Sequence, residues 1–322
     1  MAARGRPGGG ILKSAMLALK IAVSALLLLL VISYVDVDAI RPRLMRADPF
    51  WLGLSLLALA TQFIISTLRW HDVCGALELE ISYRDTLSLG LVGQLFNQIL
   101  PTNFGGDGIR ILAMSRHGWP WTAAGRTVLV DRAVGVLFII GAAALSLLVA
   151  VARGKPHIPE AGLIFAFVAA LLVTIAILVA FAAPHVERAR ERYGWLRPVS
   201  WGLNGLRRAL SSQKWTPPIL AKALLVHVLL VQSFCFAAAS LGIEVNRDLF
   251  LLVTLIILAS AFPLSFAGWG VREGATVSGL ALIGVSPTDA ILISLLHGVG
   301  QIVIGLFGIV LVPSWLFGQR DP

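Results

Sequence analysis

The chain has 322 residues, of which 57% are hydrophobic and only 13% are charged, and its mean hydropathy is +0.86. These values exclude an ordinary water-soluble domain and indicate an integral membrane protein. The formal charge of +9 is interpreted as the excess of basic residues that membrane proteins carry in their cytoplasmic loops, and not as a surface for nucleic acid.

Several apolar runs are long enough to cross a hydrocarbon core of roughly 30 Å, which needs about 20 helical residues. They lie near residues 12–34, 50–68, 127–152, 159–182, 218–241 and 288–317. Two shorter apolar segments, 86–100 and 249–262, run directly into proline and glycine and are predicted to be half-helices. The predicted fold is all-α, with about six spanning helices and two re-entrant broken hairpins.

The first apolar run follows several basic residues, as in a secretory signal peptide, but "VISYVDVDAI" offers no small-residue cleavage site. Because the run is also long enough to span, we predict an uncleaved first helix. The two cysteines, Cys74 and Cys235, form no metal or redox spacing and are interpreted as packing residues. No metal or cofactor is predicted.

Basic residues dominate the segment 184–216, where only Glu187 and Glu191 are acidic, so this segment is predicted to be a cytoplasmic loop. With both termini cytoplasmic and each short segment returning to the side it entered, most of the 26 lysine and arginine residues lie inside. Within the loop, residues 190–208 mix arginine with tryptophan and leucine. This composition suits a helix at the headgroup level of an anionic leaflet, with an ordinary basic loop as the alternative.

A polar motif occurs twice: "LPTNFGGDGIR" at 100–110 and "FPLSFAGWGVR" at 262–272. We infer a duplication within one membrane domain, 1–322, with repeat units over 50–152 and 218–317. In the topology derived from the charges the first unit begins outside and the second inside, so the units form an inverted-topology repeat, as in secondary transporters. The motifs are identical at five of eleven aligned positions, Pro101/Pro263, Phe104/Phe266, Gly106/Gly268, Gly108/Gly270 and Arg110/Arg272.

Each motif is expected to end one helix and to act as a hinge or gate, because proline removes a backbone donor and glycine permits unusual backbone conformations. The helices are expected to restart at about Ile109 and Val271, with free N–H groups and the positive dipole end facing a polar cavity near the midplane. The candidate hinge residues are Pro101, Gly105, Gly106, Gly108, Pro263, Gly268 and Gly270.

Arg110 and Arg272 lie in the first turn of the restarted helices, where a guanidinium suits a phosphate group. The alternative is a structural ion pair, for which Glu273 beside Arg272 is a candidate partner. Since a charge buried in the membrane costs roughly 2.5 to 3.5 kcal/mol on insertion scales, its presence at two equivalent positions favours anion binding.

Further polar candidates flank the motifs. Asp107 is expected to pair with an arginine or to cap the restarted helix. "VDRAVG" places Asp131 and Arg132 inside a long apolar helix, and "LLHGVG" places His297 at the arginine's position in the second unit. For the polar residues of these two segments, structural ion pairing is one interpretation, and a role in headgroup binding or proton relay is the other. The predicted substrate-binding residues are Arg110, Arg272, Arg132, Asp107, Asp131, Asn103, Glu273 and His297.

In this order and spacing, "LPTNFGGDGIR", "VLVDRAVG" and "FPLSFAGWGVREG" resemble the transmembrane region of lysylphosphatidylglycerol synthases, also called the flippase-like domain family. The resemblance implies a multi-pass inner-membrane protein. It also implies that relatives move aminoacylated phospholipid between leaflets or are linked to polyprenyl-phosphate or hopanoid pathways. The bifunctional synthases carry a soluble aminoacyl-transfer domain after this region, whereas this chain ends at "WLFGQRDP". We therefore expect no synthase activity.

The sequence favours a flippase-like protein that binds an anionic lipid headgroup near the midplane and moves it by alternating access. One alternative is a non-transporting accessory subunit of a lipid or cell-envelope synthesis complex. Another is a membrane-embedded transferase. Paired carboxylates or a histidine cluster would support this function, but the sequence offers only isolated carboxylates. The expected partner is a membrane lipid, namely an anionic phospholipid, a polyprenyl-phosphate or a hopanoid-related lipid, with synthesis enzymes as further candidates. ATP use is not expected, because no nucleotide-binding glycine motif occurs.

Overall fold

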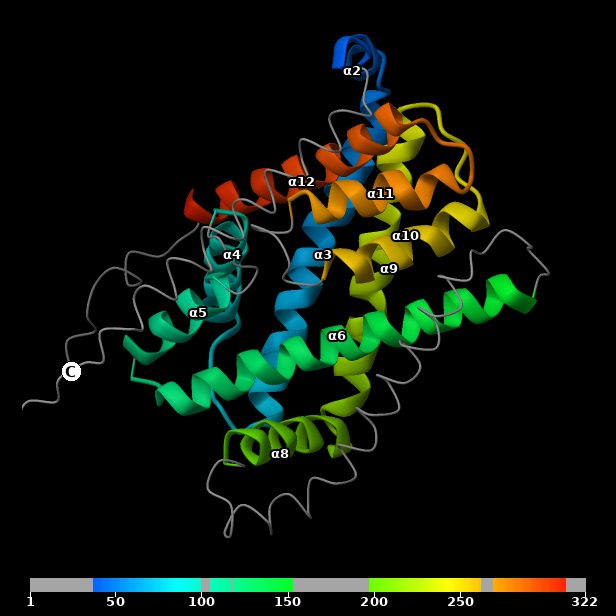
Figure 1. Ribbon diagram of the computed structural model, residues 1–322. Coiled ribbons are helices and arrows are strands. Elements are labelled where there is room, and N and C mark those ends of the chain that lie inside the picture. Colours follow the sequence, from blue (N-terminus) through cyan, green and yellow to red (C-terminus); the bar gives the residue numbers. More distant parts are fainter. Residues whose placement is uncertain (1–36, 100–104, 117, 153–196, 262–268, 311–322) are drawn as a thin grey trace, which may run out of the picture.

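The computed structural model describes residues 37–99, 105–116, 118–152, 197–261 and 269–310, and every regular element within these ranges is an α-helix. Two sets of four helices follow each other, each in the order long, short, short, long (Figure 1). The first set is α3 (Pro49–Ala76), α4 (Tyr83–Ile99), α5 (Gly105–Arg116) and α6 (Trp121–Ala152). The second is α9 (Thr216–Ser240), α10 (Arg247–Ser260), α11 (Val271–Ala281) and α12 (Pro287–Val310). A further helix precedes each set, α2 (Val37–Met45) and α8 (Arg197–Ser211).

Local signals in the sequence set several helix ends. Asp48 caps α3 by accepting the N–H of Phe50 at 2.8 Å, and Asn246 caps α10 by accepting the N–H of Leu249 at 3.0 Å. After α9 the chain turns at Gly242, whose φ of +76° is the left-handed conformation that glycine adopts readily. These ends are encoded by residues next to them in the chain, independently of the rest of the fold.

α3 and α9 lie side by side through the middle of the molecule (Figure 1). At one end the N–H of Asp48 donates to the carbonyl of Ser240 at 2.8 Å. At the other end Asp72 of α3 forms an ion pair with Lys222 of α9. The first helices of the two sets therefore run antiparallel.

The two sets pack against each other reciprocally. α4 lies on α12, and α10 lies on α6, so the first short helix of each set covers the last helix of the other. The preceding helices follow the same rule, since α2 contacts α12 and α8 contacts α6. Arg43 of α2 reaches Asp289 of α12 through two hydrogen bonds of 2.9 and 2.7 Å, which raise the pKa of the Arg43 guanidinium. Exchanging the two sets leaves this pattern of contacts unchanged.

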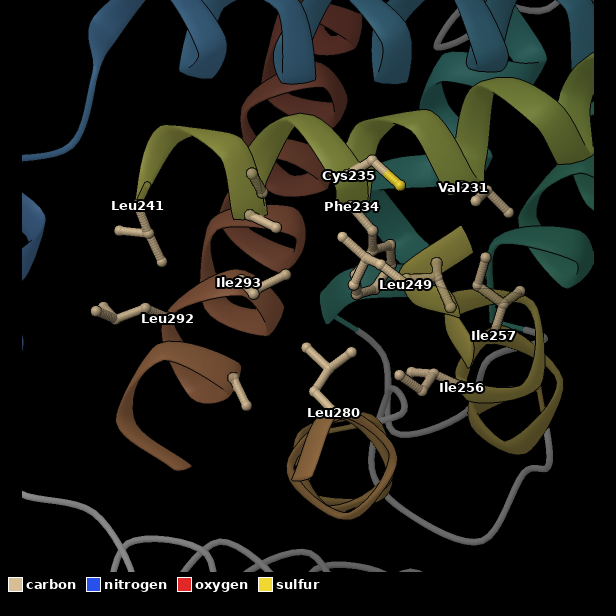
Figure 2. Close-up of a cluster of buried hydrophobic side chains, with 14 residues drawn as sticks. Val231, Phe234, Cys235, Leu241, Leu249, Ile256, Ile257, Leu280, Leu292 and Ile293 are labelled. Atoms are coloured by element: carbon tan, nitrogen blue, oxygen red, sulfur yellow. The ribbon is translucent and has the colours of Figure 1, made fainter. Parts of the chain in front are cut away.

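Each set encloses a hydrophobic core of its own. Figure 2 shows the core of the second set, to which all four of its helices contribute, including Phe234, Leu249, Leu280 and Ile293. The first set has the equivalent arrangement, built from Trp70, Leu89, Met114 and Val128. A third cluster, which includes Val73, Val130, Leu206 and Ile219, joins α3, α6, α8 and α9. The cores therefore hold each set together and attach α8 to both.

In the described ranges, four helices are long and apolar enough to cross a membrane, over residues 49–76, 121–150, 216–240 and 287–307. Their outer faces expose large apolar side chains, among them Leu57, Leu148 and Phe307, which are each more than 60% exposed. Such surfaces suit contact with lipid and not with water. The predicted spans near 12–34 and 159–182 lie outside the described residues.

The predicted boundaries hold in part. α4 and α10 cover the two predicted short segments, and α11 begins at Val271 as predicted. The predicted restart at Ile109 is wrong, because α5 is already helical at Gly105 and the side chain of Asn97 accepts the N–H of Gly106 at 2.8 Å. α6 also begins before residue 127, at Trp121, since its first turns include polar residues that an apolar run leaves out.

Gly106 lies where α5 meets the backbone of α4. A Cβ at this position would be 1.8 Å from the carbonyl oxygen of Gly93 and 2.5 Å from its carbonyl carbon. A Cβ at Gly108, two residues later in the same helix, would have no atom within 4 Å. Gly106 therefore permits a close helix contact, whereas Gly108 faces open space.

Gly106→Ala is expected to destabilise the protein by roughly 1 to 3 kcal/mol, because the obstructing atoms are backbone atoms that cannot rotate away. Gly108→Ala is the matched control and is expected to leave stability unchanged or to raise it by up to about 1 kcal/mol. Thermal melting of the two purified variants in one detergent measures the difference. Equal melting temperatures would contradict the close contact.

Candidate functional site

The predicted site residue Arg110 projects from α5 into a narrow slot between α3 and α4. Its guanidinium carbon lies 3.7 Å from the centroid of the Trp70 ring, a cation–π contact. The aliphatic part of the side chain passes Gly93, where a Cβ would lie 2.6 Å from Cδ of Arg110. The Trp70 ring and the absence of a side chain at Gly93 thus fix the position of Arg110.

Asp107, one turn earlier in α5, binds two arginines. It accepts a hydrogen bond from Arg110 at 3.3 Å and two from Arg132 of α6 at 2.7 and 3.2 Å. The carboxylate is buried. Asp107 thus joins α5 to α6. Pairing with an arginine is one of the two roles that the sequence predicts for Asp107.

Asp131 precedes Arg132 in α6 and pairs in another direction. Its carboxylate accepts a hydrogen bond from Arg69 of α3 at 2.9 Å, and both side chains are only 7% exposed. Gly135, one turn later, provides space, since a Cβ there would lie 3.3 Å from the Arg69 guanidinium. This pair corresponds to the structural alternative for Asp131, and it joins α3 to α6.

We call Arg69, Arg110, Arg132, Asp107 and Asp131 the arginine cluster. Three guanidinium groups and two carboxylates give these side chains a formal surplus of one positive charge. The Nε of Arg110 is buried without a hydrogen-bond partner. The Arg132 side chain is 38% exposed, compared with 11% for Arg110. The cluster therefore carries excess positive charge and is accessible at Arg132.

Arg272 in α11 has a different environment, although its motif repeats that of Arg110. It donates to Glu273 at 3.0 and 2.7 Å and to the hydroxyl of Ser294 at 3.0 Å, and it lies against the Trp269 ring. The other oxygen of Glu273 accepts the N–H of Gly270 at 2.6 Å. The charges of Arg272 and Glu273, which we call the Arg272 pair, cancel. This geometry matches the ion-pair alternative.

His297 lies in a line of polar side chains that crosses from α4 to α9. The Gln98 amide donates to the Gln301 oxygen at 2.5 Å, and the Gln301 amide nitrogen lies 2.9 Å from Nε2 of His297. Because that nitrogen only donates, Nε2 of His297 accepts, and Nδ1 carries the proton toward the Ser233 hydroxyl at 3.0 Å. Both ring nitrogens are thus engaged, and His297 is part of a buried network separate from the arginine cluster.

A family model described as "Lysylphosphatidylglycerol synthase TM region" matches residues 17–308. The chain belongs to this family. The match includes both helix sets, the arginine cluster and the Arg272 pair. A search of curated proteins found no matching relative.

In this member of the lysylphosphatidylglycerol synthase TM-region family, the predicted site residues fall into separate groups. Arg110, Arg132, Asp107 and Asp131 lie in one cluster, Arg272 and Glu273 form a second, and His297 belongs to neither. Gly105, Gly106 and Gly108 form the first turn of α5, and Gly270 precedes α11 with a φ of +90°. Asn103, Pro101, Pro263 and Gly268 lie outside the described residues.

Sequence reasoning missed several residues that shape the clusters. Trp70 and Gly93 form the slot for Arg110, and Ser294 binds the Arg272 pair. Gly298 leaves room for Arg272, since a Cβ there would lie 2.3 Å from its guanidinium. The only available signal was a glycine or small polar residue within an apolar helix, which is too common to be specific. In the described ranges, no group of three or more His, Cys, Asp or Glu side chains is placed to hold a metal.

Asp131→Asn is expected to destabilise this family member by roughly 3 to 5 kcal/mol, because it leaves Arg69 buried without its carboxylate. The double variant Arg69→Met/Asp131→Leu is expected to recover most of that loss, since it removes both charges. Thermal melting in detergent compares the two variants. A double variant no more stable than Asp131→Asn would show that the two charges do not depend on each other.

Proposed function

We propose that the protein is a flippase-like lipid transporter that binds the phosphate of an anionic headgroup, or a lipid-linked phosphate, at the arginine cluster. The observation that carries this proposal is the surplus of positive charge, with three guanidinium groups sharing two carboxylates inside a bundle with apolar outer faces. Charge within a membrane domain is costly unless it is compensated. Phosphate is the anionic group that is most common in membrane lipids, and it would compensate this positive charge.

Arg132 is the residue that meets the headgroup in this proposal. It is the most exposed arginine of the cluster, and Asp107 holds it through two of its nitrogens. Asp107 is in turn held by Arg110, which Trp70 and Gly93 fix from behind. A guanidinium oriented in this way before the ligand arrives loses little side-chain entropy on binding, which favours recognition of a planar pair of phosphate oxygens.

Reciprocal packing of the two helix sets supports movement by alternating access. Because exchanging the sets preserves the same helix contacts, we infer a second arrangement of similar energy in which the cluster opens to the other side. In the orientation we propose, the sets are inverted relative to each other in the inner membrane, with both termini and the basic segment 184–216 cytoplasmic. The neutral Arg272 pair joins α11 to α12, and it serves to position α11.

The carboxylates support binding over catalysis. Asp107, Asp131 and Glu273 each accept hydrogen bonds from a guanidinium group. A general base needs a carboxylate that can reach its substrate's proton, and each of these carboxylates already binds a guanidinium group. We therefore favour a transporter without enzymatic activity over a membrane-embedded transferase.

Arg132→Gln is expected to lower the rate of leaflet exchange roughly tenfold or more, because it removes a charge-assisted hydrogen bond to the phosphate. The measurement follows a fluorescent anionic phospholipid in proteoliposomes. Arg116→Gln, which removes the same charge at the exposed end of α5, is the matched control and is expected to behave as the unmodified protein. Arg132→Lys is expected to retain part of the rate.

Unchanged exchange and lipid binding in Arg132→Gln would contradict the site assignment. Native mass spectrometry of co-purified lipid identifies the ligand, since phospholipid, polyprenyl-phosphate and hopanoid differ in mass. We expect a phosphate-bearing lipid that Arg132→Gln loses and Arg116→Gln keeps. A stoichiometric protein partner, together with no exchange by the isolated chain, would instead favour the accessory-subunit function.

A further inference from the structure

α8 lies across α6 at the end of the molecule opposite α2 (Figure 1). Gly202 and Gly205 allow this crossing to be close, because Cβ atoms there would lie 3.3 Å from the Leu129 side chain and 2.8 Å from that of Val130. Further residues of α8, including the buried Leu206, pack into the cluster shared with α3 and α9. α8 is therefore a fixed part of the helix bundle.

Arg126 of α6 lies at this crossing. Its guanidinium carbon is 5.0 Å from the centroid of the Trp201 ring, and its Nε is buried without a hydrogen-bond partner. The positive charge of Arg208, on the exposed side of α8, acts on Arg126. In the part of the chain that the structure describes, no carboxylate pairs with either guanidinium.

The surrounding sequence does not neutralise these charges. Between Glu191 and Glu244 there is no acidic residue, and the basic residues of this interval are Arg192, Arg197, Arg207, Arg208, Lys214 and Lys222. Two like charges near each other repel, and an anion between or beside them relieves that repulsion. The crossing of α6 and α8 therefore suits an anion by charge.

The neighbouring surface indicates that the anion belongs to a lipid. Trp121, the first residue of α6, and Leu129, one turn beyond Arg126, are both exposed on the spanning helix. An exposed tryptophan at the start of a span and an exposed leucine further in are typical of the boundary between headgroups and acyl chains. Arg126 lies between these two residues in the chain, so this pattern places it at the level of the headgroups.

We propose that Arg126, Arg208 and Trp201 form a peripheral site for the phosphate of an anionic phospholipid in the leaflet at the α8 end. The two guanidinium groups bind the phosphate oxygens, and the acyl chains lie along the apolar face of α6. Arg126 and Arg132 lie on the same helix, but Arg126 meets α8 whereas Arg132 meets α5. The peripheral site therefore does not depend on the proposed transport.

Hydrogen–deuterium exchange of the α8 amides in nanodiscs tests this site directly. In nanodiscs of zwitterionic lipid with added phosphatidylglycerol, the unmodified protein is expected to show slower exchange in α8 as the anionic lipid increases. Arg126→Gln/Arg208→Gln is expected to need roughly thirtyfold more anionic lipid for the same protection, from the usual contribution of two basic residues near an anionic leaflet. Arg126→Lys/Arg208→Lys is expected to keep most of the response.

Arg208→Gln alone changes an exposed position and is expected to weaken the response roughly fivefold without disturbing the fold. Arg247→Gln, an exposed arginine at the start of α10, is the matched control and is expected to respond as the unmodified protein. An undiminished response in Arg208→Gln and the double variant, or an equal loss in Arg247→Gln, would overturn the site. Equal protection by inorganic phosphate in purely zwitterionic nanodiscs would overturn its assignment to a lipid.

Discussion

The cost of placing positive charge in an apolar bundle decides which helices of this protein meet. Arg69 is paired with Asp131, and this joins α3 to α6. Arg132 is paired with Asp107, and this joins α6 to α5. Because leaving one partner alone costs more than the pair itself contributes, these contacts specify the arrangement of helices more than they add to its stability. Two further pairs, Arg43–Asp289 and Lys222–Asp72, are more exposed than Arg69–Asp131 and join α2 to α12 and α9 to α3.

Local patterns in the sequence predicted the short helices and the start of α11. They offered the pairing of Arg272 with its neighbour Glu273 only as the alternative to anion binding. These features depend on residues close together in the chain. The slot formed by Trp70 and Gly93 could not be predicted, because it exists only where α3, α4 and α5 approach one another. The glycines of the first motif were interpreted as helix breakers, because contacts between helices cannot be seen in the sequence alone. The role of Gly106 in close packing appears only in the packed structure.

The two helix sets share an order of elements and a pattern of contacts, but they differ in charge. The first set surrounds an arginine cluster with surplus positive charge, whereas the Arg272 pair of the second set is neutral and caps its own helix through Gly270. The repeated motif therefore places its two arginines in different charge environments, whereas the sequence predicts two equivalent anion contacts. In our proposal for this family member, the headgroup is bound by the first set, and the second supplies the matching framework.

The contact between Gly93 and Gly106 has a mechanical consequence. Backbone meets backbone there, Asn97 holds the first turn of α5, and the Arg110 side chain fills the space beside Gly93, so sliding of α5 along α4 would be obstructed at this point. We therefore expect α4 and α5 to move together. Gln98 joins α4 to α12 through Gln301, so we expect a displacement of the α4–α5 pair to reach the last helix of the other set.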